Sequence, residues 1–235
     1  MQSAQRNVTL SQTTVGMKAL MAVSGLALFG FLVGHLLGNL KLYAGPQALN
    51  DYAAFLHSIP ALLWTARIGL LAAIGAHIYA AYKLALRKSD ARPVPYKKKE
   101  HLVTNYAART MYWSGPILLF FIVYHLAHLT FGRTPGYVFD PQNVYNNVVY
   151  GFQNIWVSAI YIVGNLAVGF HLYHGLWSMF QTLGASHPRY DRWSKRFAVI
   201  FSLALTAGNL SLPISVLAGW VEPADADYPA EDLEA

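Results

Sequence analysis

Five long apolar stretches constrain the fold of this 235-residue chain more than any other feature. They cover residues 17–40, 61–82, 112–131, 155–183 and 197–220. About 20 apolar residues are enough to cross the hydrocarbon core of a bilayer as an α-helix. Only 12% of the residues are charged, against about 25% in soluble domains. The sequence therefore predicts an all-α integral-membrane protein, one domain over residues 1–235, with five transmembrane helices and an acidic tail at 221–235.

Basic residues gather in the gaps on one side of the predicted membrane. Fourteen of the 17 Lys and Arg residues lie near the N-terminus, between the second and third stretches, or between the fourth and fifth. Cytoplasmic loops are enriched in Lys and Arg. The pattern predicts a multi-pass membrane protein with the N-terminus inside and the C-terminus outside. It also accounts for the net charge of +6 without a nucleic-acid partner.

A short segment between the first two stretches predicts an additional helix. Between Gln47 and Ile59, the apolar residues Leu49, Tyr52 and Leu56 repeat at helical spacing. Such spacing gives a helix one apolar face. We expect it to lie in the outer interface.

The chain has no cysteine and nine histidines. Without cysteine, this chain cannot form disulfides, thiolate metal sites, iron–sulfur ligation or covalent haem attachment. Ionisable residues within membrane spans are rare and usually functional. Five histidines fall within the predicted spans, and His128 lies near the end of the third; the five are His35, His77, His125, His171 and His174. The other three lie in loops, where we expect them to be solvated.

The helical rise places four of these histidines in two layers. His35 and His125 lie ~25 Å beyond the inner start of their spans, at 1.5 Å per residue, and therefore near the outer face. His77 and His171 lie ~25 Å beyond the outer start of theirs, near the inner face. Two neutral imidazoles at one depth can bind the iron of a b-type haem from both sides. The spacing therefore predicts two haem b groups, stacked across the membrane within the bundle formed by the first four helices.

Two roles without haem are alternatives for these histidines. The side chains can hydrogen-bond between helices without binding a cofactor. A di-iron hydroxylase would need dense histidine clusters at one membrane face, whereas this chain has only two His-x-x-His pairs, on opposite halves of the bilayer. Small residues near the histidines permit either close helix packing or a flat macrocycle, and the sequence does not separate these uses; they are Gly34, Gly38, Gly75, Ala76, Gly169 and Gly175.

Short sequence motifs around the histidines resemble a known family. They include Gly34-His35-Leu36-Leu37-Gly38-Asn39-Leu40, Gly75-Ala76-His77, Tyr124-His125-Leu126 and Phe170-His171-Leu172-Tyr173-His174. Over about residues 10–220 the chain resembles the five-helix, di-haem cytochrome b (b558-type) membrane anchor of succinate dehydrogenase and fumarate reductase. The resemblance implies four axial iron ligands. They pair as His35 with His125 at a distal haem and His77 with His171 at a proximal haem.

The resemblance also implies a division of labour among subunits. A flavoprotein subunit would oxidise succinate, and an iron–sulfur subunit would carry the electrons to this chain. This chain would anchor both subunits at the inner face and pass electrons through its haems to a quinone, with menaquinone favoured. We expect the docking contacts to involve the inner basic residues Lys97, Lys98, Lys99, Arg189, Arg192 and Arg196.

Further contacts are expected around the haems and the quinone. Candidates for haem propionates or the haem surroundings are Lys18, Ser24, Arg67, Arg109, His128 and His174; Trp64 and Arg67 are the quinone candidates. No Asp or Glu lies within any predicted span. Several relatives carry a Glu where this chain has Arg67 or Gly169, so we do not expect a proton path built on a buried carboxylate.

Two further functions are alternatives to the succinate–quinone complex. One is the di-haem cytochrome b subunit of another respiratory oxidoreductase, such as a hydrogenase or formate dehydrogenase. The other is a non-redox membrane scaffold or transporter with structural histidines. A transporter would more often show internal repeats or broken helices, and neither is evident in the sequence.

Overall fold

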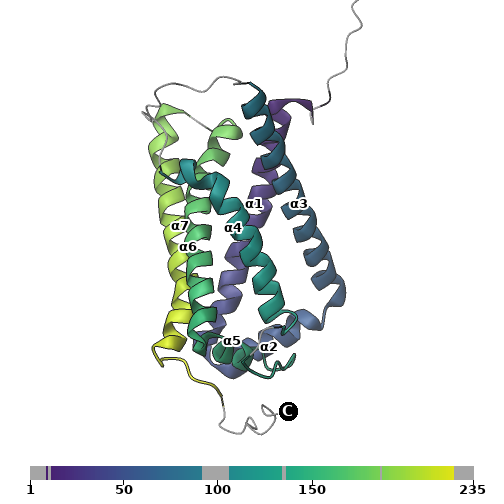
Figure 1. Cartoon of the computed structure of the whole chain (residues 1–235), viewed down its shortest axis with the longest axis vertical. Helices are drawn as coiled ribbons and strands as arrows, with labels where there is room; N and C mark the ends of the chain where they lie inside the picture. Colours follow the sequence, from purple (N-terminus) through teal and green to yellow (C-terminus); the bar gives the residue numbers. More distant parts are fainter. Residues whose placement is uncertain (1–8, 10–11, 92–105, 134–135, 186, 225–235) are drawn as a thin grey trace, which may run out of the picture.

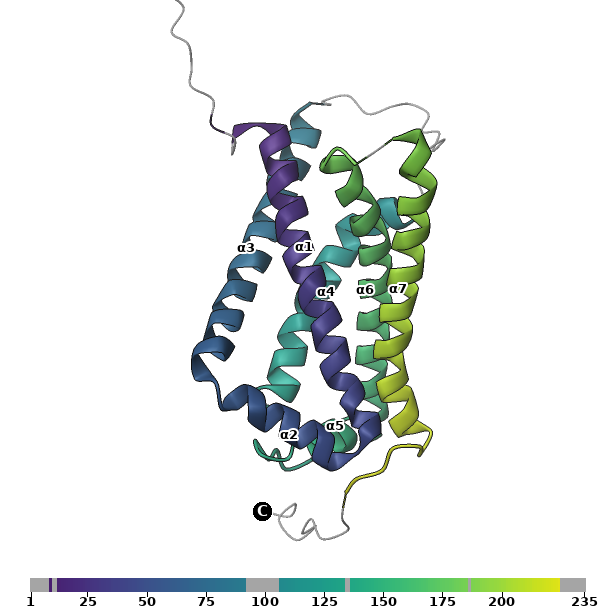
Figure 2. The same cartoon turned by 180° about the vertical axis from the view of Figure 1, so that it is seen from behind.

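The computed structural model of the chain is built from helices and contains no strand in the residues that it describes. These residues are 9, 12–91, 106–133, 136–185 and 187–224, with the backbone alone described for 106–110. Figures 1 and 2 show the long helices side by side, with two short helices at one end.

The five long helices are α1 (Thr14–Asn39), α3 (Pro60–Asp90), α4 (Tyr106–Leu129), α6 (Ile155–Thr182) and α7 (Pro188–Leu217). Each contains a segment long and apolar enough to cross a membrane. The prediction of five transmembrane helices is confirmed at this level. The helix α3 continues past the apolar stretch 61–82 to Asp90, and α7 begins at Pro188, before the stretch 197–220, because polar residues at these ends also form helix.

Local capping explains where several helices begin. The side chain of Thr13 accepts a hydrogen bond from the amide of Gly16 at the start of α1 (2.9 Å). Asn154 caps α6 in the same way, accepting from the amides of Trp156 and Val157. Such side chains satisfy amides that have no partner within the helix. The helices α3 and α7 start with proline, which needs no amide partner there.

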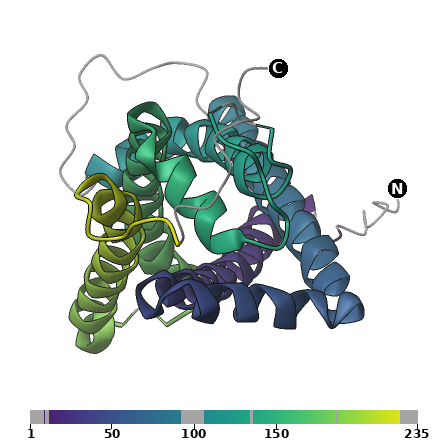
Figure 3. The ribbon, with the colours of Figure 1, turned by 90° about the horizontal axis from the view of Figure 1, so that it is seen from below.

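The two short helices form a cap over one end of the molecule. They are α2 (Pro46–His57), which follows the 3-10 helix η2 (Leu40–Ala44), and α5 (Val144–Gln153). Figure 3 views this end and shows both lying across the long helices. We call it the cap end, and the opposite end, where α1 and α7 begin, the base end. The helix expected between Gln47 and Ile59 is confirmed as α2, whereas α5 was not predicted.

The cap is joined to the rest of the chain by polar contacts. Asn50 of α2 donates to Asn143 Oδ1 (3.2 Å) and accepts from the amide of Tyr145 (2.9 Å). Asn146 of α5 pairs with the backbone of Ala224, which follows α7, through two bonds of 3.0 Å. Burial, with the charge of Glu222 as a smaller cause, raises the pKa of Tyr145. Its hydroxyl therefore keeps its proton and donates to the Glu222 carbonyl (2.9 Å).

The long helices pack in a definite order. α1 lies along α3, α4 lies along α6, and α6 also lies along α7, while α1 meets α6. Within the described residues, neither α1 with α4 nor α3 with α6 packs along its length. Many large apolar side chains remain exposed, such as Trp113 and Trp156. A helix that is apolar on every side is typical of a membrane span.

Candidate functional site

The four paired histidines lie on four different helices and meet as two pairs. The imidazoles of His35 (α1) and His125 (α4) have ring centroids 5.7 Å apart, near the cap end. Those of His77 (α3) and His171 (α6) have centroids 6.2 Å apart, closer to the base end. These are the same two pairs that the helical rise per residue predicted to lie at a common depth in the membrane. Each pair joins two helices that do not pack along each other.

The spacing of each pair fits a metal ion between two imidazoles. An imidazole nitrogen binds a metal at about 2 Å, so two imidazoles on opposite sides of one ion have centroids roughly 6 Å apart. The measured separations of 5.7 and 6.2 Å lie close to this value. The donor set also fits a haem, whose iron takes imidazole as an axial ligand.

Hydrogen bonds fix which nitrogen of His77 is free to bind a metal. His77 Nδ1 lies 3.2 Å from the Met21 carbonyl oxygen and 3.2 Å from Ser24 Oγ, both on α1. A carbonyl can only accept, so Nδ1 carries the proton. Ser24 donates its own proton to the Leu20 carbonyl (2.7 Å) and can accept from His77. This leaves Nε2 of His77 with a lone pair for a ligand.

His171 is held in the same manner by the helix beside it. Its Nδ1 lies 3.1 Å from Ser114 Oγ of α4. Ser114 is buried and can donate to the Met111 carbonyl (3.3 Å), an arrangement in which its oxygen accepts from His171. Both ligand candidates near the base end are therefore oriented by a serine on the neighbouring packed helix. Ser114 was not singled out from the sequence, although a hydroxyl in an apolar span is a usable signal.

The cap-end pair is surrounded differently. His125 Nδ1 lies 3.2 Å from the hydroxyl of Tyr161 on α6, and His128 Nδ1 lies 2.9 Å from the same hydroxyl. His35 stacks on Phe31 at 5.2 Å and forms no ring hydrogen bond to the described residues. His128 is fully buried. Its Nδ1 contacts Tyr161, and its ring is not a member of either histidine pair. Tyr161 was missed as a site residue, because its contact joins residues 36 positions apart.

The structure distinguishes glycines at close helix contacts from glycines beside open space. A Cβ at Gly38 would lie 2.6 Å from the Tyr52 ring, and one at Gly169 would collide with Thr206, so both permit close packing. At Gly34, Gly75 and Gly175 a Cβ would meet no described atom within 4 Å. Gly175 lies one turn from His171, on the same helix face. It leaves room for a flat group beside that ligand.

The remaining candidates are spread over both ends. Arg67 lies over the Trp64 ring at 5.2 Å, in the first part of α3. Lys18 is exposed. The side chain of Arg109 lies outside the described residues. His174 has its Nε2 3.1 Å from Ser178 Oγ, and its buried Nδ1 has no partner among the described residues. That nitrogen is available to a polar group of a bound cofactor.

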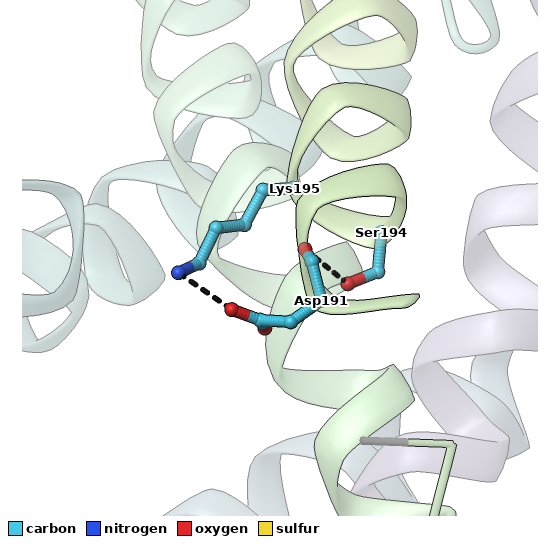
Figure 4. Close-up of polar contacts among 3 residues, drawn as sticks. All are labelled: Asp191, Ser194 and Lys195. Carbon is cyan, nitrogen blue, oxygen red and sulfur yellow. Dashed lines mark hydrogen bonds and ion pairs between the residues drawn. The ribbon is translucent and has the colours of Figure 1, made fainter. Parts of the chain in front are cut away.

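The base end carries exposed basic residues at the start of α7. Arg189, Arg192 and Arg196 are exposed. Figure 4 shows Lys195 turned toward Asp191, at 2.9 Å, with Ser194 donating to the Asp191 carbonyl. Lys195 also lies 4.9 Å from the Trp177 ring centroid. The three arginines are therefore the positive groups at this site best placed to meet a partner. Lys97, Lys98 and Lys99 lie outside the described residues.

No group of three or more His, Asp or Glu able to hold one metal ion occurs in the described part of the chain. Comparisons with protein-family models, with curated proteins and with solved structures found no match for this chain.

Proposed function

We propose that this chain is the membrane-anchoring cytochrome b subunit of a succinate:quinone oxidoreductase. The observation that carries the proposal is the meeting of His35 with His125 and of His77 with His171 across unpacked helix pairs. Haem b bound at both positions supplies one-electron redox chemistry at two levels of the membrane. The succinate dehydrogenase and fumarate reductase part of the proposal rests on the sequence motifs around these histidines.

The residues around the two histidine pairs then have defined roles. Ser24 and Ser114 hold the Nδ1 protons of their histidines, which keeps Nε2 unprotonated and raises the basicity of the ligand. All four paired histidines are partly buried among the apolar helices. His174 offers its unpaired nitrogen to a cofactor near the base end. Trp64 and Arg67, which stack on each other, are the proposed quinone contacts.

The partners follow from charge and composition. The chain has no cysteine, so the iron–sulfur clusters lie in another subunit. We assign the base end to the cytoplasmic face of a bacterial inner membrane, where Lys and Arg are enriched. The arginines at the start of α7 would contact the iron–sulfur or flavoprotein subunit there. The exposed apolar sides of the long helices would contact lipid.

A reduced-minus-oxidised spectrum of the purified protein tests the haem part of the proposal. We expect a b-type haem signal with two haems per chain. His35→Ala and His77→Ala should each keep one haem, and the double variant none. His57→Ala is the matched control, because His57 is exposed and its one hydrogen bond within the described residues is to the Ala53 carbonyl of its own helix (2.8 Å).

Co-purification tests the identity of the complex. We expect a flavin-containing, succinate-oxidising partner to accompany the chain from native membranes. A chain without b haem would contradict the whole proposal. Two haems with a hydrogenase or formate dehydrogenase partner would instead support the alternative respiratory complex.

A further inference from the structure

The hydroxyl of Tyr161 joins two histidines at the cap-end site. It lies 3.2 Å from His125 Nδ1 and 2.9 Å from His128 Nδ1. Tyr161 is 5% exposed. Its ring is fixed by edge contacts with Phe121 at 5.3 Å and Phe152 at 4.8 Å. The hydroxyl therefore has a defined position between the two imidazoles.

His128 is locked against that hydroxyl from the other side. It is 0% exposed, and its Nε2 has no partner among the described residues. A Cβ on Gly151 of α5 would lie 2.5 Å from this nitrogen, so only glycine lets the cap close on the ring. His128 is packed between α5 and Tyr161 and cannot turn toward His35.

Iron binding by His125 fixes the direction of one of these hydrogen bonds, and cooperativity between consecutive bonds favours the direction of the other. A tyrosine hydroxyl has one proton to donate, and a neutral imidazole has one N–H. If Tyr161 donated to His125, the proton of His125 would sit on Nε2, which then could not bind iron. If His125 donates to Tyr161 and Tyr161 donates to His128, Nε2 of His125 keeps its lone pair. Consecutive bonds in one direction also strengthen each other.

We propose that Tyr161 is a positioning residue for the His125 ligand, accepting from His125 Nδ1 and donating to His128 Nδ1. This rests on the proposed haem-binding function. By accepting a hydrogen bond from Nδ1, Tyr161 makes His125 a more basic ligand, which favours oxidised iron over reduced iron. The two histidines of the cap-end pair differ in this respect, because His35 has no such hydrogen bond among the described residues.

The substitution Tyr161→Phe tests the proposal, since it removes the hydroxyl and keeps the ring. It is made in the His77→Ala background, which retains only the cap-end haem. Loss of such supporting contacts typically changes metal affinity 10–100-fold. We expect a change of about tenfold in the preference for oxidised over reduced haem, which raises the midpoint potential by about 59 mV for one electron. A redox titration followed by absorption measures it.

Two controls separate this effect from a change in folding. Tyr124→Phe removes a hydroxyl from the same aromatic cluster, 6.1 Å from Tyr161 between ring centroids, and should leave the potential unchanged. Tyr161→Phe in the His35→Ala background should leave the base-end haem unchanged. A selective loss of the cap-end haem, restored by excess haem, would also support the proposal.

Three results would overturn it. These are an unchanged cap-end potential, an equal shift in Tyr124→Phe, and the loss of both haems when Tyr161→Phe is made in the otherwise unchanged chain. Absence of haem from the unsubstituted protein would contradict the proposed function instead, so the two failures are distinguishable.

Discussion

Three of the four paired histidines follow one rule at the level of single residues, and His35 is the exception. His77 is held by Met21 and Ser24 on α1, the helix that packs beside its own. The other two held rings, His125 on α4 and His171 on α6, are held from each other's helix. In these three histidines, Nδ1 contacts a group on the helix packed beside its own. Nε2 is therefore the nitrogen left to bind a metal ion between the two packed helix pairs. The orientation of these three imidazoles thus follows from ordinary helix packing.

Close packing at Gly164 supports the cap-end site and gives a prediction about stability. A Cβ there would lie 2.6 Å from Cγ of Phe121, whose ring contacts both His125 and Tyr161. We expect Gly164→Ala to destabilise the protein by about 1–3 kcal/mol, because the aromatic ring has no room to move. Thermal unfolding in detergent measures the change. Gly30→Ala is the control, since a Cβ there meets no described atom within 4 Å; an equal loss in both variants would contradict the prediction.

The residues of the site divide into those that sequence reasoning could find and those that it could not. The paired histidines follow from helical rise within apolar stretches, which needs no tertiary information. Tyr161 and Ser114 act through contacts 36 and 57 positions away. Such contacts depend on which helices pack together, and no periodicity in the sequence records that.

At the level of elements, the cap depends on a polar latch between α2 and α5. Asn50 uses both ends of its amide, donating to Asn143 and accepting from the Tyr145 amide. Asn143 in turn caps α5 by accepting from the amide of Asn146 (3.1 Å). One side chain therefore joins α2 to the first turn of α5.

Removal of this latch should weaken the cap. We expect Asn50→Ala to lower the free energy of unfolding by about 1–3 kcal/mol, because the Tyr145 amide loses its partner. Thermal unfolding and amide hydrogen exchange of α5 both report it. Gln47→Ala is the control on the same helix, because Gln47 bonds only to the exposed Asp51 (2.7 Å) and should change stability by less than about 0.5 kcal/mol. Unaltered exchange in α5 would argue against the latch.

Of the two short helices of the cap, only one was predicted from the sequence. α2 was predicted from apolar residues at helical spacing. α5 has only 10 residues and lies in a segment rich in asparagine and tyrosine. It contacts α2, α6 and α7, and a helix this short is marginal without such packing. Its apolar residues Val144, Val148 and Phe152 recur at helical spacing, a signal that sequence reasoning missed. Asn143, a good N-cap, was the one local signal of its start.

On the scale of the whole molecule, the two ends have different chemistry. The cap end is closed by α2, α5 and the segment after α7, whereas the base end presents the arginines at the start of α7. In the proposed complex, soluble subunits dock on the basic end and quinone is reached from the membrane near the cap end. This division of the molecule requires the base end to face the cytoplasm.

The orientation gives the last prediction, and the absence of cysteine makes it direct to measure. Ser58 and Ser89 are exposed and lie at the two ends of α3, at the cap and base ends. In intact bacterial cells whose outer envelope admits the reagent, we expect a membrane-impermeant maleimide to label Ser58→Cys. Ser89→Cys should react only after permeabilisation. Positive charge holds a loop on the cytoplasmic side, and the basic residues 83–109 begin at the Ser89 end. The reverse labelling would place the basic residues outside and would exclude docking of cytoplasmic subunits on the arginines of α7.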